Sequence, residues 1–338
     1  MENQIGRATT AQLSIRNLHV HYSTEGEVVR AVNGINLTLA KGESLGLVGE
    51  TGAGKTTTAF SIMRLLPKIT GTIAAGEILF EGLDLVKASE EEMRSIRGNR
   101  ISMIFQDPMT SLNPIFTVGE QIAEVYEIHG KADHAAAMEK AGDMLELVGI
   151  PRGRAQDYPH QFSGGMKQRV IIAAALACNP ELLLADEPTT ALDVTIQAQV
   201  LRMIKDLRAR LGTTLILISH DLGVVAQICD KVAIMYAGRI VEYGKFSDII
   251  RKPFHPYTEG LFNSIPRMEV ESARLTPIKG LMPDPSRLPP GCVFKPRCPY
   301  AREICAERAP ESVETEGRRV ECLMYEGVIE NRMGANHG

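Results

Sequence analysis

One stretch of the chain, residues 49–56, matches the phosphate-binding pattern G-x-x-x-x-G-K-[ST] at every position. The apolar run from Glu43 to Val48 predicts a short buried strand before it, and Thr57 to Leu66 predicts a helix after it. Glycines let such a loop wrap around an anion, with backbone N–H groups and the helix N-terminus directed at phosphate oxygens. A glycine-rich turn before an ordinary helix would not explain the full match. A nucleoside triphosphate is therefore the first ligand to consider.

Two side chains of this loop carry the predicted chemistry. Lys55 can reach the β and γ phosphate oxygens, and the Thr56 hydroxyl can ligate Mg²⁺. The residues predicted to bind the nucleotide in this region are Gly49, Glu50, Thr51, Gly52, Ala53, Gly54, Lys55, Thr56 and Thr57.

The composition indicates a globular chain without a general affinity for nucleic acid. Of its 338 residues, 44% are hydrophobic, which is enough for a sizeable core and about two domains. The net charge is −4 and the basic residues are scattered, so no basic patch attracts nucleic acid. Residues 1–10 lack the apolar centre of a secretion signal, and no apolar run approaches the ~18 residues of a spanning helix. We expect a cytosolic chain that works at a membrane only by docking on a separate membrane protein.

The hydrophobic pattern predicts an α/β protein with several kinds of strand. Alternating segments predict antiparallel strands, and continuous apolar runs predict strands buried in a parallel sheet. The predicted antiparallel strands are 13–22 and 28–39, a further strand bounded by turns is 76–82, the buried strands are 181–185 and 214–218, and a final hairpin covers 232–236 and 239–243.

Two other regions interrupt or follow this core. The pattern from Val118 to Leu147 is helical and predicts a helical insertion. Beyond Arg251 the composition shifts to prolines and cysteines, which predicts a separate, loop-rich extension.

An apolar strand from Leu182 to Ala185 delivers two adjacent carboxylates, Asp186 and Glu187, to its C-terminal end. Open α/β sheets bind their ligands at this end. Asp186 can hold the magnesium shell, and Glu187 can polarise or deprotonate an attacking water. Taken alone, an Asp-Glu pair before Pro188 favours a turn. Together with the phosphate-binding loop, the pair favours a catalytic site.

Residues 162–169, FSGGMKQR, resemble the signature sequence of ATP-binding-cassette (ABC) ATPases. Further family motifs stand in the required order along the chain: a Q-loop at Gln106 before this signature, and a D-loop at Asp193 and a switch histidine at His220 after it. Met166 replaces the glutamine of the commonest signature, and it leaves the Ser-Gly-Gly segment intact.

The resemblance covers roughly residues 13–250 and implies a P-loop ABC ATPase fold, with a RecA-like core, an antiparallel β subdomain and a helical subdomain. The implied regions are a nucleotide-binding domain at 1–250, with its helical subdomain at about 108–178, and an extension at 251–338.

In this family, Ser163, Gly164 and Gly165 reach the γ-phosphate bound by a partner cassette, so ATP is expected to lie between two cassettes. The resemblance implies that His220 contacts the γ-phosphate and the attacking water, although a lone histidine at a strand end is more often structural. It also assigns Gln106 to the link between the metal, the water and the helical subdomain, although Gln106 alone would be an ordinary polar loop residue.

Two further positions complete the expected nucleotide site. Tyr22 matches the family's adenine-stacking position, although a strand tyrosine is more often a packing residue. Asp193 belongs to the D-loop. The expected ligands are ATP and Mg²⁺, with Thr56, Gln106 and Asp186 around the metal.

Longer strings resemble the oligopeptide/dipeptide/nickel importer subfamily, and Phe162 with Met166 resembles its D-type peptide ATPase. This implies an ATP hydrolase that drives import of di- or oligopeptides from the cytoplasmic face of the cell membrane as a peripheral subunit. The implied partners are an F-type ATPase subunit, two membrane permeases and, indirectly, an extracytoplasmic binding protein. Alternatives are a nickel or other small-solute importer, or a soluble ABC protein in translation or DNA repair.

Four of the six cysteines crowd the C-terminal region. A cytosolic chain keeps its thiols reduced, so four clustered cysteines favour metal ligation over disulfides. The spacing lacks the C-x₂₋₄-C pairs of structural zinc sites and also differs from ferredoxin patterns. The resemblance to peptide-importer ATPases implies a [4Fe–4S] cluster, with zinc and free thiols as alternatives. The expected ligands are Cys292, Cys298, Cys305 and Cys322.

Overall fold

The computed structural model describes residues 11–24, 26–106, 111–190, 192–264 and 278–330, which form two compact units. The first unit comprises the residues up to Ser14, Leu37–Ser44 and Ile78–Ile218. The second comprises Ile15–Asn36, Leu45–Glu77 and the residues from Ser219 on. The predicted carboxylate pair therefore belongs to the first unit, and the phosphate-binding loop belongs to the second.

Parallel strands form the centre of the first unit. Strand β7 (Leu182–Asp186) pairs with β6 (Ile101–Ile104) on one side and with β8 (Thr214–Ser219) on the other. Every residue of the three strands is buried, which agrees with their continuous apolar sequences. The prediction of buried parallel strands at 181–185 and 214–218 is confirmed.

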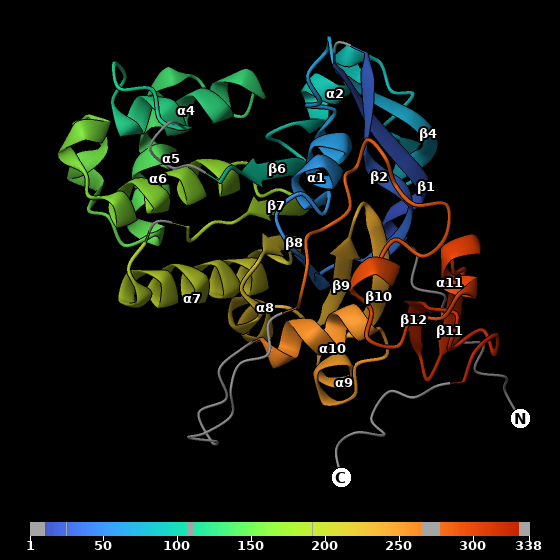
Figure 1. Ribbon diagram of the computed structural model, residues 1–338. Coiled ribbons are helices and arrows are strands. Elements are labelled where there is room, and N and C mark those ends of the chain that lie inside the picture. The colour runs from blue at the N-terminus through green and yellow to red at the C-terminus, as the bar shows by residue number, and fades with distance from the viewer. Residues whose placement is uncertain (1–10, 25, 107–110, 191, 265–277, 331–338) are drawn as a thin grey trace, which may run out of the picture. The chain divides into compact units, whose positions relative to one another are not determined.

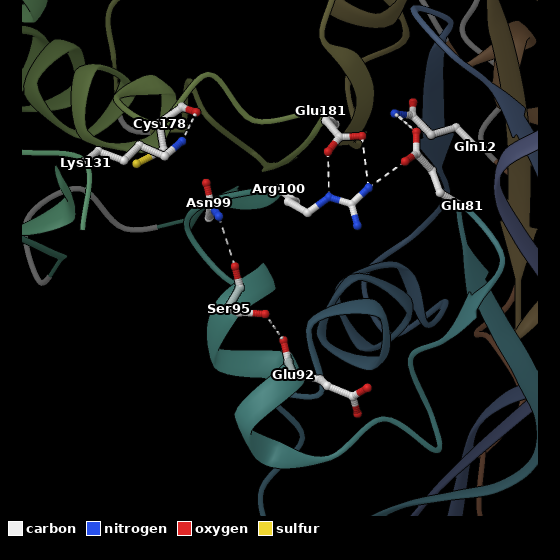
Figure 2. Close-up of polar contacts among 9 residues, drawn as sticks. All are labelled: Gln12, Glu81, Glu92, Ser95, Asn99, Arg100, Lys131, Cys178 and Glu181. Carbon is white, nitrogen blue, oxygen red and sulfur yellow. Dashed lines mark hydrogen bonds and ion pairs between the residues drawn. The ribbon is translucent and has the colours of Figure 1, made fainter. Parts of the chain in front are cut away.

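Figure 2 shows the polar network at the beginning of β6 and β7. Arg100 lies directly before β6, and its Nε donates to Oε1 of Glu181, directly before β7, at 2.6 Å. Its Nη2 pairs with Oε2 of Glu81 at 2.5 Å, and Gln12 Nε2 lies 3.5 Å from the other oxygen of Glu81. The Arg100 hydrogen bond lowers the pKa of Glu181, so this charged pair fixes the starts of two neighbouring strands.

The helical insertion consists of separate helices, each begun by a polar side chain. Helix α4 (Val118–Ile128) starts at Thr117 with a capping box to Glu120, and α5 (His134–Leu147) starts at Asp133. Both pack on each other and on α6 (Gly164–Leu176), as Figure 1 shows. The predicted helical stretch 118–147 is thus interrupted, because Gly130 adopts φ +63° between the two helices.

The remaining elements of the first unit are short or peripheral. They are β5 (Leu83–Asp84), α2 (Glu90–Ile96), η1 (Arg152–Gln156), η2 (Pro159–Gln161) and α7 (Val194–Leu211). A four-stranded sheet has the order β2-β1-β4-β5, and most residues of its strands β1 (Ala11–Thr24), β2 (Glu27–Ala40) and β4 (Gly71–Phe80) belong to the second unit. The strands predicted at 13–22 and 28–39 are confirmed, and the strand predicted at 76–82 begins earlier.

The second unit contains a mixed sheet. Strand β3 (Ser44–Val48) pairs in parallel with β9 (Lys231–Tyr236), which forms the predicted hairpin with β10 (Arg239–Lys245). Beyond β10 lie β12 (Arg318–Glu321) and β11 (Ser312–Thr315), both antiparallel to their neighbours (Figure 1).

The extension therefore contains strands as well as loops, and the sequence did not predict these strands. The β11–β12 hairpin extends the sheet, because β12 pairs with the edge of β10. The turn between β11 and β12 contains Glu316 and Gly317, whose φ angles are +47° and +70°. Such a turn has the backbone of a type I′ hairpin. Its flanking segments, SVET and RRVE, are too polar to predict a strand by hydrophobic pattern.

The helices of the second unit are mostly short. They are α1 (Lys55–Met63), α8 (Leu222–Ile228), α9 (Phe246–Arg251), α10 (Pro256–Asn263), η3 (Lys295–Arg297) and α11 (Ile304–Glu307). Within the described ranges, no helix of either unit combines the length and the apolar character needed to cross a membrane.

A buried carboxylate anchors the extension to β10. The side chain of Glu242 is fully buried and accepts hydrogen bonds from the backbone N–H groups of Phe254, at 3.0 Å, and His255, at 2.9 Å. Nη1 of Arg318, on β12, lies 3.7 Å from its Oε1, and the guanidinium carbon lies 3.4 Å from the centre of the Phe254 ring. One residue thus connects β10, the start of α10 and β12.

We expect Glu242→Ala to lower the free energy of unfolding by about 3–5 kcal/mol, because it leaves two buried N–H groups without acceptors and a buried guanidinium without its counterion. A matched control is Glu27→Ala, which removes an exposed ion pair with Arg287 and should cost less than about 1 kcal/mol. Urea unfolding of both variants measures the difference, and equal effects would contradict the anchoring role of Glu242.

Candidate nucleotide site

The phosphate-binding loop connects β3 to α1, as predicted. Gly52 and Gly54 have φ +84° and +101°, a region that favours glycine. A Cβ atom on Gly54 would lie 2.4 Å from the backbone oxygen of Ala31, and one on Gly49 would lie 2.2 Å from that of Met235. The loop therefore depends on glycine for both its backbone angles and its close contacts.

Lys55 points back into this loop. Its side chain is 7% exposed, and Nζ donates to the backbone oxygens of Gly49, at 2.7 Å, and Glu50, at 3.0 Å. A buried ammonium group inside a loop of backbone N–H groups can attract phosphate oxygens. Thr56 follows it at the start of α1.

Two other predicted residues lie in the same unit as the loop. The Tyr22 hydroxyl donates to Oγ1 of Thr57 at 3.3 Å, so the ring lies beside the start of α1. This position is compatible with stacking on a base. His220 directly follows β8 and is exposed, while the next residue, Asp221, caps α8 through the N–H groups of Gly223 and Val224.

The first unit brings Gln106 and Glu187 together. Nε2 of Gln106 donates to Oε2 of Glu187 at 2.9 Å, and the Thr190 hydroxyl donates to the same oxygen at 3.0 Å. Glu187 has φ +45°, which is uncommon for a non-glycine residue. Asp186 ends β7 and is 2% exposed. The rest of the predicted Q-loop, Asp107 and Pro108, lies outside the described residues.

The signature residues begin a helix, as predicted. Ser163 is the N-cap of α6, and its Oγ accepts from the N–H of Met166 at 3.4 Å. Gly165 lies so close to α7 that a Cβ would meet Cγ2 of Ile196 at 2.6 Å. Asp193 caps α7 by accepting from the N–H of Ile196 at 3.0 Å. Two helix N-termini, each with a partial positive charge, therefore lie side by side.

The four C-terminal cysteines line one small cavity of about 20 Å³, together with His255 and Phe294. Burial raises the pKa of both Cys298 and Cys322 to about 12, so these thiols are protonated at neutral pH. Within the described part of the chain, no group of three or more His, Cys, Asp or Glu side chains is arranged to hold a metal ion. The prediction of a formed cluster-binding domain is therefore not supported.

His255 is fully buried beside these thiols. Burial lowers its pKa to about 3, so the imidazole is neutral, and its Nδ1 accepts from the N–H of Tyr257 at 3.0 Å. His255 is the N-cap of α10 and not a charged group of the cavity.

Sequence reasoning missed residues of the extension that contact the phosphate-binding loop. Nη1 of Arg297 lies 2.8 Å from Oε2 of Glu50, and the Tyr257 hydroxyl accepts from the N–H of Glu50 at 3.0 Å. The partners are 247 and 207 positions apart in sequence, so no local pattern indicated these contacts.

Comparisons with known proteins agree with this geometry. Residues 32–190 match the family described as ABC transporter, and residues 241–305 match the oligopeptide/dipeptide transporter C-terminal region. A probable peptide ABC transporter ATP-binding protein of Sinorhizobium fredii is 53% identical, over 94% of this chain and 96% of its own length. The dipeptide transport ATP-binding protein DppD of Bacillus subtilis is 50% identical, over 93% of this chain and 95% of its own length. The chain belongs to the ABC transporter ATP-binding proteins of the oligopeptide/dipeptide family.

A solved structure supports the fold of this ABC ATPase. A dimeric ATP-binding cassette in a post-hydrolysis state, bound to ADP and phosphate, is 27% identical with a TM-score of 0.62, over 69% of this chain and 98% of the other. The predicted α/β P-loop ABC ATPase fold and the assignment to ATP-hydrolysing cassettes are confirmed.

We expect Gly54→Ala to weaken nucleotide binding at least about tenfold, because the new Cβ clashes with the Ala31 carbonyl and requires an unfavourable φ. Gly82→Ala is the matched control, since Gly82 has φ +88° but nothing within 4 Å of its Cβ position. Calorimetric titration with Mg·ATP measures both. Equal affinities of the two variants would contradict the steric role of Gly54.

Proposed function

We propose that this ABC ATPase hydrolyses ATP to power the import of di- or oligopeptides, as a peripheral subunit on the cytoplasmic face of the cell membrane. The observation that carries the proposal is the match along nearly the whole chain, the C-terminal region included, to proteins whose names specify peptide transport. Uptake of a labelled dipeptide by vesicles containing the reassembled transporter tests it. Nickel uptake without dipeptide uptake would overturn the peptide assignment.

In this proposal, each step of ATP binding and hydrolysis is assigned to particular residues of the two units. Lys55 neutralises the β and γ phosphates, while Thr56 and Asp186 hold Mg²⁺, with Gln106 beside it. Glu187 activates the attacking water as a general base. Its hydrogen bonds from Gln106 and Thr190 support this role, because they fix one carboxylate oxygen and orient the other. His220 contacts the γ-phosphate, and Tyr22 stacks on the adenine.

A second cassette completes the site in this proposal. Ser163, Gly164 and Gly165 begin α6 with N–H groups that can receive a phosphate, beside the α7 start capped by Asp193. We assign these residues to the ATP bound by a partner F-type ATPase subunit. Closure of the two cassettes moves two permeases through the helical subdomain, at about 108–178 of the 1–250 cassette. An extracytoplasmic binding protein delivers the peptide to the permeases.

The proposal for residues 251–338 is that Cys292, Cys298, Cys305 and Cys322 hold a [4Fe–4S] cluster of structural or regulatory role. The four side chains line one cavity, which supports a shared ligand. The cavity has room for little more than one water-sized group, so the thiols must move outward and lose their protons to hold a cluster. Zinc is the alternative ion.

We expect Glu187→Gln to retain Mg·ATP binding and to lower kcat by at least about a hundredfold in the assembled transporter, because the amide keeps the shape but cannot accept a proton. Lys55→Ala should instead weaken binding. Phosphate release and Mg·ATP titration separate the two effects. Near-normal turnover by Glu187→Gln would refute the role of general base.

We expect protein purified without oxygen to contain about four irons per chain. Cys298→Ser should lower the iron content, whereas Cys178→Ser should not, because Cys178 is a buried thiol of the first unit. Metal analysis of the three proteins measures this. Stoichiometric zinc without iron would contradict the cluster.

A further inference from the structure

Arg297 is a buried cation held in one orientation. It ends η3, directly before Cys298, and its side chain is 5% exposed. Nε donates to the backbone oxygen of Lys279 at 3.1 Å, Nη2 donates to that of Ile278 at 3.4 Å, and Nη1 lies 3.4 Å from the Tyr236 hydroxyl. These contacts orient the guanidinium so that Nη1 can also donate a hydrogen bond to the phosphate-binding loop.

The target of Arg297 is the Glu50 carboxylate. Nη1 lies 2.8 Å from Oε2 of Glu50, and the carboxylate side chain is only 32% exposed. A charge-assisted hydrogen bond of this kind, largely shielded from water, is among the stronger polar contacts in proteins. Glu50 is the second residue of a loop built to attract anions, so an unpaired carboxylate here would oppose a bound polyphosphate.

The backbone of Glu50 is held from the same side. The Tyr257 hydroxyl accepts from its N–H at 3.0 Å, and Tyr257 is completely buried, with its ring 4.7 Å from that of Tyr236 and 5.5 Å from that of Phe294. The carbonyl oxygen of Glu50 accepts from Lys55 Nζ. One loop residue therefore connects the phosphate-binding lysine to the extension.

A third contact lies further along the loop. A Cβ atom on Gly52 would be 2.9 Å from Cε of Met282, so the segment after residue 277 lies against the loop. The N–H of Arg30 also donates to the backbone oxygen of Pro285 at 3.0 Å. The extension thus contacts the loop through the Arg297–Glu50 ion pair, the hydrogen bond from the Glu50 N–H to the Tyr257 hydroxyl and the apolar contact of Met282, and it also contacts β2 through Arg30.

We propose that Arg297 is a positioning residue for ATP binding: it neutralises Glu50 and holds the loop open for the phosphates. The inference rests on the loop being the ATP site. It extends the nucleotide site to the C-terminal extension. The effect falls on affinity for Mg·ATP and on KM, because Arg297 acts through Glu50 and touches no group of the reaction.

The test is calorimetric titration of the full chain with Mg·ATP. Arg297→Gln should weaken binding at least about tenfold, and Arg297→Lys should recover only part of that loss, because it keeps the charge but lacks the Nε and Nη2 contacts that orient the guanidinium. Adding Glu50→Gln to Arg297→Gln should recover most of the loss, because the double variant removes both charges. In the assembled transporter, Arg297→Gln should raise KM for ATP with little change in kcat.

Arg308→Gln is the matched control, since it breaks another ion pair of the extension, with Glu326 at 2.6 Å, and should leave the affinity unchanged. Affinity of Arg297→Gln within twofold of wild type, while Lys55→Ala abolishes binding, would overturn the inference. So would an equal loss in Arg308→Gln, or a double variant whose loss is the product of the single losses, because neither indicates a specific charge pair. Failure of the wild-type chain to bind Mg·ATP would instead overturn the proposed function, and the inference with it.

Discussion

The phosphate-binding loop is a backbone structure, and its function depends on the conformation of two glycines. Gly52 and Gly54 adopt positive φ, and Gly54 lies against the Ala31 carbonyl with no space for a side chain. A loop of this kind has few side-chain contacts of its own, so its neighbours must hold its shape. Strand β9 supplies one wall through Met235, and the extension supplies another through Tyr257 and Arg297.

In the first unit, side chains rather than backbone groups hold the candidate catalytic carboxylate of Glu187 in place. Glu187 follows the last residue of β7 with φ +45°, a conformation that costs of order 1–3 kcal/mol in a non-glycine residue. Its N–H donates to the carbonyl of Ile218 at 2.9 Å, and its carboxylate is held by Gln106 and Thr190. Both the backbone and the side chain are therefore fixed, which is how a carboxylate keeps one orientation at a strand end.

Much of this structure could be predicted from sequence, since the relevant signals are local. The loop, β7 with its two carboxylates and the Ser163 cap each occupy a few consecutive residues, and each lies where the pattern placed it. The β11–β12 hairpin was not predictable from hydrophobicity, because its strands are polar and its turn lacks the usual Asn-Gly. The contacts of Arg297 and Tyr257 with Glu50 were not predictable either, since they depend on tertiary packing.

The segment from Cys292 to Cys298 both lines the cysteine cavity and supports the phosphate-binding loop, which lies far away in sequence. It carries two of the four cysteines that line the small cavity, and it also carries Phe294, which packs on Tyr257, and Arg297, which pairs with Glu50. Arg297 and Cys298 are consecutive, so a movement of the Cys298 thiol must shift the backbone that positions the guanidinium or be absorbed by rotation of one side chain. Pro296 and Pro299 flank the pair and restrict the backbone, which leaves side-chain rotation as the main freedom. The buried guanidinium has little room to rotate, since four polar partners surround it. One short segment of the chain therefore both lines the cysteine cavity and holds the guanidinium that pairs with Glu50.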